Sequence, residues 1–234
     1  MDAVLLQRLS QITEEERELL QGRGVDRALY ASGRAFEVDA AKMLEKGKLM
    51  SIRPHTRFAP FPRHSHNYVE IMYMCRGKTV HRIDGDALVT LEAGELLFLN
   101  RHASHAIQRA DAGDIAVNFI VLPQFFDEAF NMAGIDNVLS RFLLGELYTG
   151  GAAVSYLHFR VREVLPVQNL VENMVWTLVN RQPGARRINQ VTMGLLLLQL
   201  MHYTECIDMS RNGSVRSPMV EAALRVVRAN GIDA

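Results

Sequence analysis

The chain contains few cysteines, no excess of charge and no long hydrophobic run. Its two cysteines, Cys75 and Cys206, lie far apart, and this spacing does not indicate a disulfide framework. Lysine plus arginine and aspartate plus glutamate number 26 each, so we do not expect the basic surface that is typical of nucleic-acid-binding domains. No apolar run approaches the roughly 20 residues of a membrane helix. The opening Met1–Leu6 lacks the basic region of a signal peptide, and we therefore expect a soluble, cytoplasmic protein.

Obvious catalytic patterns are missing as well. We find no nucleophile–base pair, no phosphate-cradling glycine loop and no second carboxylate at a useful spacing. The length of 234 residues and the 48% hydrophobic content are ordinary for one or two compact domains with a substantial core.

The middle of the sequence has the pattern of short strands joined by turns. Asp84-Gly85 is a typical hairpin dipeptide, and Ile115–Val121 is apolar enough for burial on both faces. Short strands at regular spacing predict a small barrel or sandwich. We expect strands at Leu49–Arg53, Tyr68–Cys75, Thr79–Ile83, Ala87–Leu91, Glu95–Leu99 and Ile115–Val121.

Helical patterns occupy both ends. Thr13 and Glu16 have the spacing of a capping box, and Asp39 can cap a second short helix. From Val167 to Val179 apolar residues follow an i, i+3, i+4 rhythm, which predicts an amphipathic helix. The next predicted helix, from Ile188 to about Met209, is apolar on all sides, so we expect it to be covered on both sides. The cover is either its own domain together with a second chain or a plain intramolecular bundle.

A group of histidines and one acid forms the main candidate site. His64, His66 and Glu70 share even parity, so on an extended strand they face the same side of a sheet. Two imidazoles and a carboxylate can hold a borderline divalent metal, and His105 from another strand could be a fourth ligand. Met72 and Met74 continue the parity and are expected to line the cavity, although filling of the barrel is the commoner role.

Three interpretations of this group remain open. It can be a metal site, a set of hydrogen-bonding groups for a small polar effector, or inward polar residues that satisfy one another. His102 is a rival to His105, three residues upstream. We expect His81 on a surface or edge of the sheet and His55 in an ordinary connection.

The spacing of the site residues resembles a known motif. His64, His66, Glu70 and Gly77 fit the first motif of the cupin superfamily, His-x-His-x3-Glu-x6-Gly. The second motif fits at Gly94 and His105, whereas Asn100, His102 and Arg109 stand where proline, glycine and asparagine would be. Together with the helical second half, the sequence resembles the effector-binding region of AraC-type transcription regulators.

The resemblance implies an α+β fold, namely a cupin-like β-barrel (double-stranded β-helix or jelly roll) with short N-terminal helices and a C-terminal helical dimerisation region. We expect a helical segment at 1–47, the barrel at 48–123, the dimerisation region at 124–209, and a linker with the first helix of a truncated helix-turn-helix domain at 210–234. DNA would be bound only through a C-terminal domain that these residues lack, and no membrane partner is expected.

The function implied is sensing of a small effector, such as a sugar or related carbon compound, by a homodimeric regulator that is not an enzyme. The alternative is a metal-dependent cupin enzyme, namely an isomerase, dioxygenase or decarboxylase. A divalent Zn, Ni, Fe or Mn ion would then be held by His64, His66, Glu70 and His105.

Overall fold

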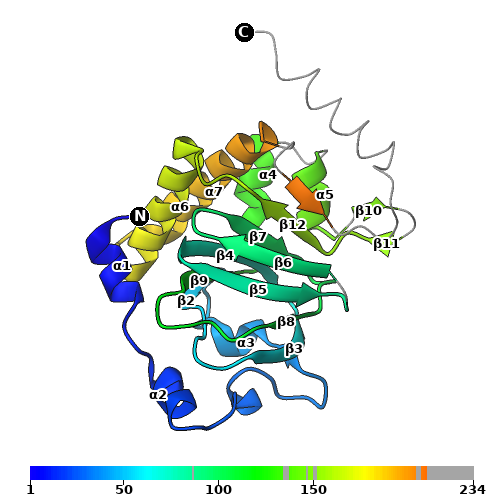
Figure 1. Ribbon diagram of the computed structural model, residues 1–234. Helices are drawn as coiled ribbons and strands as arrows, with labels where there is room; N and C mark the ends of the chain where they lie inside the picture. Colours follow the sequence, from blue (N-terminus) through cyan, green and yellow to red (C-terminus); the bar gives the residue numbers. More distant parts are fainter. Residues whose placement is uncertain (86, 134–136, 146, 150–151, 204–206, 210–234) are drawn as a thin grey trace.

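The computed structural model describes residues 1–85, 87–133, 137–145, 147–149, 152–203 and 207–209 (Figure 1). The helices are α1 Ala3–Leu9, α2 Glu14–Leu20, η1 Arg27–Leu29, α3 Ala40–Met43, η2 Pro123–Phe126, α4 Asp127–Ala133, α5 Val138–Leu143, α6 Leu165–Val179 and α7 Ala185–Met201. The strands are β1 Glu37–Val38, β2 Met50–Pro54, β3 Phe61–His66, β4 Val69–Arg76, β5 Lys78–Ile83, β6 Ala87–Glu92, β7 Leu96–Leu99, β8 His105–Ile107, β9 Ile115–Val121, β10 Tyr148–Thr149, β11 Ala152–Ala153, β12 Tyr156–Phe159 and β13 Ile207–Met209.

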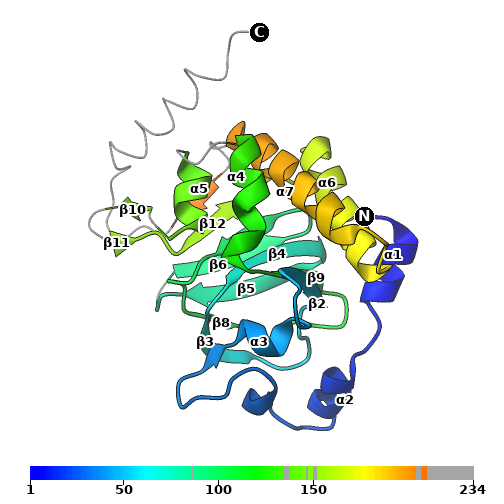
Figure 2. The same cartoon turned by 180° about the vertical axis from the view of Figure 1, so that it is seen from behind.

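Two sheets pack against each other, and helices cover the outer face of one of them (Figures 1 and 2). The six-stranded sheet has the order β13-β12-β7-β4-β9-β2, and the five-stranded sheet has the order β1-β3-β8-β5-β6. One apolar cluster fills the space between the sheets, and a second joins the six-stranded sheet to α1, α5, α6 and α7. The expected α+β, cupin-like fold is therefore confirmed.

Alternation along the central strands divides these two clusters. On β4, Ile71 and Tyr73 point to the helices, whereas Met72 and Met74 point between the sheets. All four side chains are at least 98% buried, as expected for a strand with a covered sheet face on both sides. The predicted strand Ile115–Val121 is confirmed with the same bounds as β9.

The predicted hairpin around Asp84-Gly85 is also confirmed. Strands β5 and β6 pair in antiparallel fashion, with Ile83 opposite Ala87. Asp84 and Gly85 both adopt positive φ, at 48° and 99°, and aspartate and glycine are among the residues that tolerate this conformation best.

The second half of the chain differs from the expectation in two places. α6 forms as predicted, but α7 ends at Met201 instead of near Met209, and Ile207–Met209 forms β13. β13 pairs with β12, and β12 pairs with β7, so the region expected to be helical adds two strands to the six-stranded sheet. We predicted a helix past Met201 because apolar residues suit a buried strand as well as a buried helix.

The N-terminal segment contacts both apolar clusters, through α1 on the helix side and through Tyr30, Val38 and Ala40 between the sheets. Thr13 and Glu16 form the predicted capping box of α2, and Asp39 caps α3. A short strand that the sequence pattern did not reveal, β1, pairs in parallel with β3. The predicted linker and helix at 210–234 lie outside the described residues.

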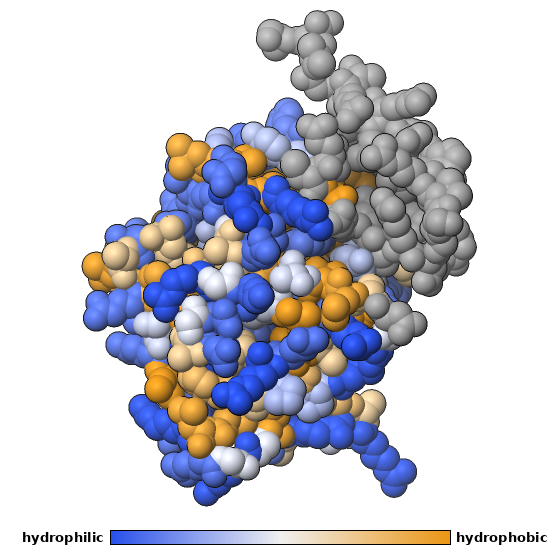
Figure 3. Space-filling model, viewed as in Figure 1, coloured by the Kyte–Doolittle hydropathy of each residue, from blue (hydrophilic) through white to orange (hydrophobic). Residues whose placement is uncertain are grey.

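The surface mixes polar and apolar side chains. On the face in Figure 3, hydrophobic residues form small groups that are separated by charged ones, as is ordinary for a globular protein. Among the described residues, no helix has the length and apolar character needed to cross a membrane.

Candidate functional site

The predicted motif lies where the chain crosses from one sheet to the other. His64 and His66 are on β3 in the five-stranded sheet, and Glu70 is on β4 in the six-stranded sheet. The expectation that all three share one strand is therefore wrong, because the chain turns at Asn67 and Tyr68. The side chains still converge, since each points from its own sheet into the space between them.

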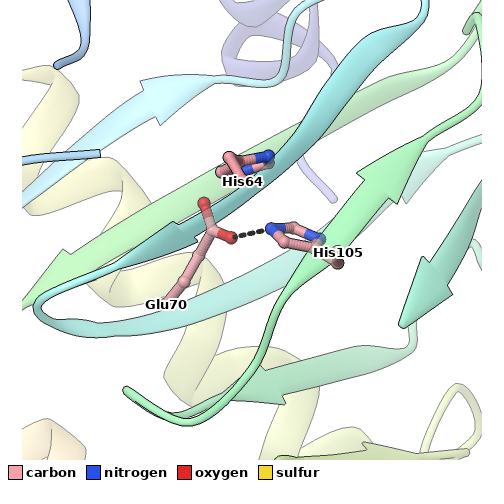
Figure 4. Close-up of side chains that lie close together, drawn as sticks. All are labelled: His64, Glu70 and His105. Carbon is pink, nitrogen blue, oxygen red and sulfur yellow. Dashed lines mark ion pairs between the residues drawn. The ribbon is translucent and has the colours of Figure 1, made fainter. Parts of the chain in front are cut away.

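The structure brings His64, Glu70 and His105 together (Figure 4). One ligand-type atom from each lies within 4.8 Å of the other two. His64 on β3 pairs with His105 on β8, and the centroids of their rings are 4.2 Å apart. His105 Nε2 lies 3.4 Å from Glu70 Oε2, and His66 Nε2 lies 3.6 Å from the same oxygen. His66 is thus adjacent to this group of three.

Several polar atoms of the group are buried without a hydrogen bond to any residue that the structure describes. They are His66 Nε2, Glu70 Oε2 and both ring nitrogens of His105. Leaving one buried polar atom unpaired costs about 1–3 kcal/mol. Such a concentration of unpaired buried polar atoms is rare in native proteins.

Backbone carbonyls orient two of the rings. His64 Nδ1 lies 2.9 Å from the Pro62 carbonyl oxygen, and His66 Nδ1 lies 3.1 Å from that of Tyr68. Because a carbonyl can only accept, each Nδ1 carries the proton and donates it. Each Nε2 therefore keeps its lone pair, which is the arrangement found in histidines that bind metals.

Burial controls the protonation of these groups. It lowers the pKa of His64 to about 4 and that of His66 to about 3, and it holds the pKa of His105 well below 6.5. It also raises the pKa of Glu70 to about 7, against the opposing effect of a 3.0 Å hydrogen bond from Asn118. The histidines are therefore neutral at pH 7, and Glu70 is close to its midpoint. The His105–Glu70 contact is not an ion pair of two full charges.

Two further histidines that we expected elsewhere lie in the same interior. His81 is fully buried, and its ring stacks on that of His105 with centroids 5.8 Å apart. His55 is 3% exposed, and its ring centroid lies 6.0 Å from that of His81. The expectations of a surface or edge position for His81 and an ordinary one for His55 are wrong. We call the five residues His55, His64, His66, His81 and His105 the interior histidines.

The remaining candidates lie outside this group. Met72 and Met74 share the inward face of β4 with Glu70 and belong to the apolar cluster between the sheets, so they fill the interior more than they line an open space. His102 is exposed, and its Nε2 contacts the Gly145 carbonyl at 3.2 Å, which removes it as a rival to His105.

A small cavity of about 40 Å³ adjoins the group and is bordered by His64, Glu70 and Asn118. This volume is enough for an ion or one or two water molecules but far below the roughly 300 Å³ of a typical small-molecule pocket. Tyr30, Val38 and Met43 from the N-terminal segment also border it. The segment therefore covers part of the entrance to the interior.

Aromatic and polar contacts hold this N-terminal cover, residues 13–43, in place. The rings of Tyr30 and Phe36 pack on Phe61 at centroid distances of 5.0 and 5.7 Å. Tyr30 donates a hydrogen bond to Glu15 at 2.5 Å, and Arg53 Nη2 donates to both Glu15 and Tyr30. These contacts hold the cover against the edge of the cavity.

A buried ion pair anchors the same cover. Arg57 donates two hydrogen bonds to the Glu16 carboxylate, at 2.6 and 2.8 Å, with exposures of 3% and 1% for the two residues. Burial alone would raise the pKa of Glu16, but the hydrogen bonds and charge of Arg57 hold it below its ordinary value. Breaking such a pair is costly, because one buried charge is left alone.

Comparison with known proteins supports this architecture. The AraC-like ligand binding domain family matches residues 51–131. Apo ToxT from Vibrio cholerae is similar in structure over 81% of this chain and 78% of its own, with a TM-score of 0.51 and 11% identity. A cupin protein from Bacteroides fragilis is 28% identical over 31% of this chain and 64% of its own, with a TM-score of 0.27. No curated protein matches the sequence.

The two-sheet fold is therefore similar to that of ToxT. Residues 51–131, the segment that matches the AraC-like ligand binding domain family, contain His55, all of the first cupin motif, His81 and His105.

Proposed function

We propose that this chain is the sensory part of an AraC-type transcription regulator, and that a small polar effector binds among the interior histidines, Glu70 and Asn118. The observation that carries the proposal is the set of buried, unpaired polar atoms that converge between the two sheets. A fold has no energetic reason to collect such atoms, because each costs stability until a guest supplies its hydrogen bonds.

The position of the N-terminal cover over the cavity supports a two-state response. A sugar-sized effector exceeds the cavity of about 40 Å³, so binding requires displacement of Tyr30, Val38 and Met43. The cover contacts the site directly, since β1 pairs with the strand that carries His64 and His66. An effector that binds more tightly to the open arrangement shifts the population toward it, and tight binding alone shifts nothing.

We further propose that α6 and α7 form a homodimer interface. Both helices present exposed apolar side chains, namely Leu165 and Trp176 on α6 and Val191 and Leu195 on α7. The opposite face of α7 packs on α4 and α6 within the chain. The effector signal would pass from the cover to this interface and change how the DNA-binding domains of such a regulator are presented.

A divalent metal ion is a second candidate ligand of the interior site. His64, Glu70 and His105 supply the donor set that Zn, Ni, Fe or Mn prefers, with His66 adjacent, and neutral imidazoles are the form that binds metals. An ion held there would act as a Lewis acid. In the alternative function, a metal-dependent cupin isomerase, dioxygenase or decarboxylase, it would polarise a substrate.

Two measurements separate the candidates. The first is metal analysis of protein purified without added metal, in which stoichiometric iron or manganese favours the enzyme. The second is a thermal-shift screen with monosaccharides and sugar acids. For the sensor we expect ligands that raise the unfolding temperature of the natural protein but not of the His64→Ala/Glu70→Ala variant. Equal shifts in both proteins would place the effector elsewhere.

A further inference from the structure

A larger pocket lies on the other side of the six-stranded sheet. It is formed by residues 45–52, which lead into and along β2, by Phe125 of η2, and by residues 177–189 around the α6–α7 turn. Its volume is about 390 Å³, within the range of roughly 300–1,000 Å³ that is usual for small-molecule sites. None of its lining residues borders the interior cavity.

A buried amide in this pocket has no partner. Asn189 is 1% exposed, and neither its Oδ1 nor its Nδ2 has a hydrogen bond to any described residue. An amide can both donate and accept, so its isolation costs more than that of a single unpaired atom. Asn189 lines the pocket, where a bound molecule can reach it.

The charged groups of the pocket favour an anion. Lys48, Arg181 and Arg186 line it together with one carboxylate, Glu45, which is paired with Lys48 at a distance of 2.6 Å. Three positive side chains thus face one negative one. The rest of the wall is largely apolar and includes Leu49, Phe125 and Leu178.

The start of α7 adds to this preference. Its N-cap is Gly184, which supplies no side-chain hydrogen bond, and its first turn contains no acidic residue. The positive end of a helix usually meets a carboxylate there, whereas α7 places Arg186 in the pocket wall. An uncapped N-terminus of a 17-residue helix next to an unpaired buried amide is an arrangement suited to binding an anion.

We infer that this pocket binds a small organic anion with an apolar body, whose head is held by Arg181, Arg186, Asn189 and the start of α7. This pocket is separate from the interior site, so the chain has two ligand-binding sites. Because the pocket joins the start of β2 to the α6–α7 turn, its ligand fixes the position of these two elements relative to each other.

The test uses the full chain and four probes. Octanoate and octyl phosphate carry a charged head and an apolar body, 1-octanol carries the body alone, and acetate carries the head alone. We expect the two amphipathic anions to raise the unfolding temperature with a saturable dependence, measured below micelle formation. 1-Octanol and acetate should have little effect, and preference between the first two probes identifies the head group.

Three variants locate the effect. In Arg181→Gln/Arg186→Gln, the affinity for octanoate measured by calorimetry should fall at least about tenfold, because charge-assisted hydrogen bonds are lost. Arg63→Gln/Arg82→Gln removes the same charge from exposed positions on β3 and β5 and should leave the affinity unchanged. Asn189→Leu should weaken octanoate binding and raise the unfolding temperature of the free protein, since an unpaired amide is replaced by a group of similar size.

The proposal is overturned if no amphipathic anion stabilises the chain, or if 1-octanol does so equally. Equal loss of affinity in both arginine pairs would also overturn it, since this would indicate an effect of net charge alone. Octanoate binding should persist in His64→Ala/Glu70→Ala, so failure of the interior site and failure of this pocket are distinguishable.

Discussion

The two faces of the six-stranded sheet are both buried, yet they carry different chemistry. On the helix side, β4 and β9 contribute apolar and aromatic side chains such as Ile71 and Phe119, and the Tyr73 hydroxyl donates a hydrogen bond to Gln168 at 2.7 Å. On the inward side the same strands carry Glu70 and Asn118 among methionines and other apolar residues. One face is therefore optimised for packing, whereas the other accepts the cost of buried polar groups. This difference is the clearest physical indication that the space between the sheets is a site.

The largest expected effect is a loss of protein stability at acid pH, caused by the interior histidines of the inward face. The interior histidines have a pKa below 6.5 in the folded protein, about 4 for His55 and His64 and about 3 for His66. Between pH 6.5 and 4 the unfolded chain therefore binds more protons than the folded chain. The contribution of the neutral histidines to the free energy of unfolding is fully present above pH 6.5. It is lost as the pH falls toward 4, by up to about 1.4 kcal/mol per pH unit for each histidine.

Urea unfolding at several pH values measures this loss. His81→Phe removes one fully buried histidine. It should reduce the slope of the free energy of unfolding against pH by the equivalent of about one proton. A pH-independent stability between 7 and 4 would mean that the histidines titrate normally and are exposed.

A substitution that creates a cavity on the helix side should have the next largest effect on the free energy of unfolding. Phe119 is 1% exposed, and Phe119→Ala should lower the free energy of unfolding by about 3–5 kcal/mol, since both buried area and packing are lost. Equilibrium denaturation in urea at pH 7.5 provides the value. A loss below about 1 kcal/mol would show that this face is loosely packed.

Replacing the buried acid Glu70 on the inward face should raise the free energy of unfolding instead of lowering it. Burial raises the pKa of Glu70 from 4.5 to about 7, so the stability associated with its proton is present below pH 4.5 and is lost as the pH rises through 7. Glu70→Gln avoids this loss and should stabilise the protein at pH 8 by up to about 3 kcal/mol, with little gain at pH 4.5.

Glu95→Gln is the matched control, because Glu95 is also buried but is held ionised. It contacts His158 Nε2 at 2.9 Å and Arg162 Nη2 at 2.9 Å, and these partners keep its pKa low despite the opposing effect of burial. Glu95→Gln should therefore destabilise the protein at pH 8. If both substitutions destabilise equally, Glu70 is a structural residue.

The smallest effect on stability is expected on the outer surface of the helices. Leu195 is 44% exposed on α7, and Leu195→Glu should leave the unfolding temperature nearly unchanged while shifting the protein from dimer to monomer. Sedimentation velocity provides the mass. Leu20→Glu, at a 54% exposed position on α2, should retain the dimer, and a dimer in both variants would place the interface elsewhere.

The sequence revealed elements whose pattern is local. The apolar run Ile115–Val121, the Asp84-Gly85 turn and the capping box of Thr13 and Glu16 each depend on neighbouring residues alone, and all three are confirmed. β12 was missed because its residues Tyr156–Phe159 lie between helical patterns, and their partner strand β7 is about 60 residues away. Pairing over such a distance leaves little local trace.

The site was predictable in part for the same reason. Parity correctly placed His64, His66 and Glu70 in one interior, although the turn at Asn67 and Tyr68 was not foreseen. His81 could have been found, since Lys78 and Arg82 have opposite parity to Thr79, His81 and Ile83, and only the latter set is buried. His55 lies in a connection without any period, so only the folded chain reveals it.

The most direct test of the account is guest binding to the inward polar groups. We propose to measure the unfolding temperature of the natural chain and of His64→Ala/Glu70→Ala with Zn²⁺ and with the panel of monosaccharides and sugar acids. We predict that at least one guest stabilises the natural chain and leaves the double variant unchanged. Identical shifts in both proteins, or no shift with any guest, would contradict the claim that the space between the sheets is a binding site.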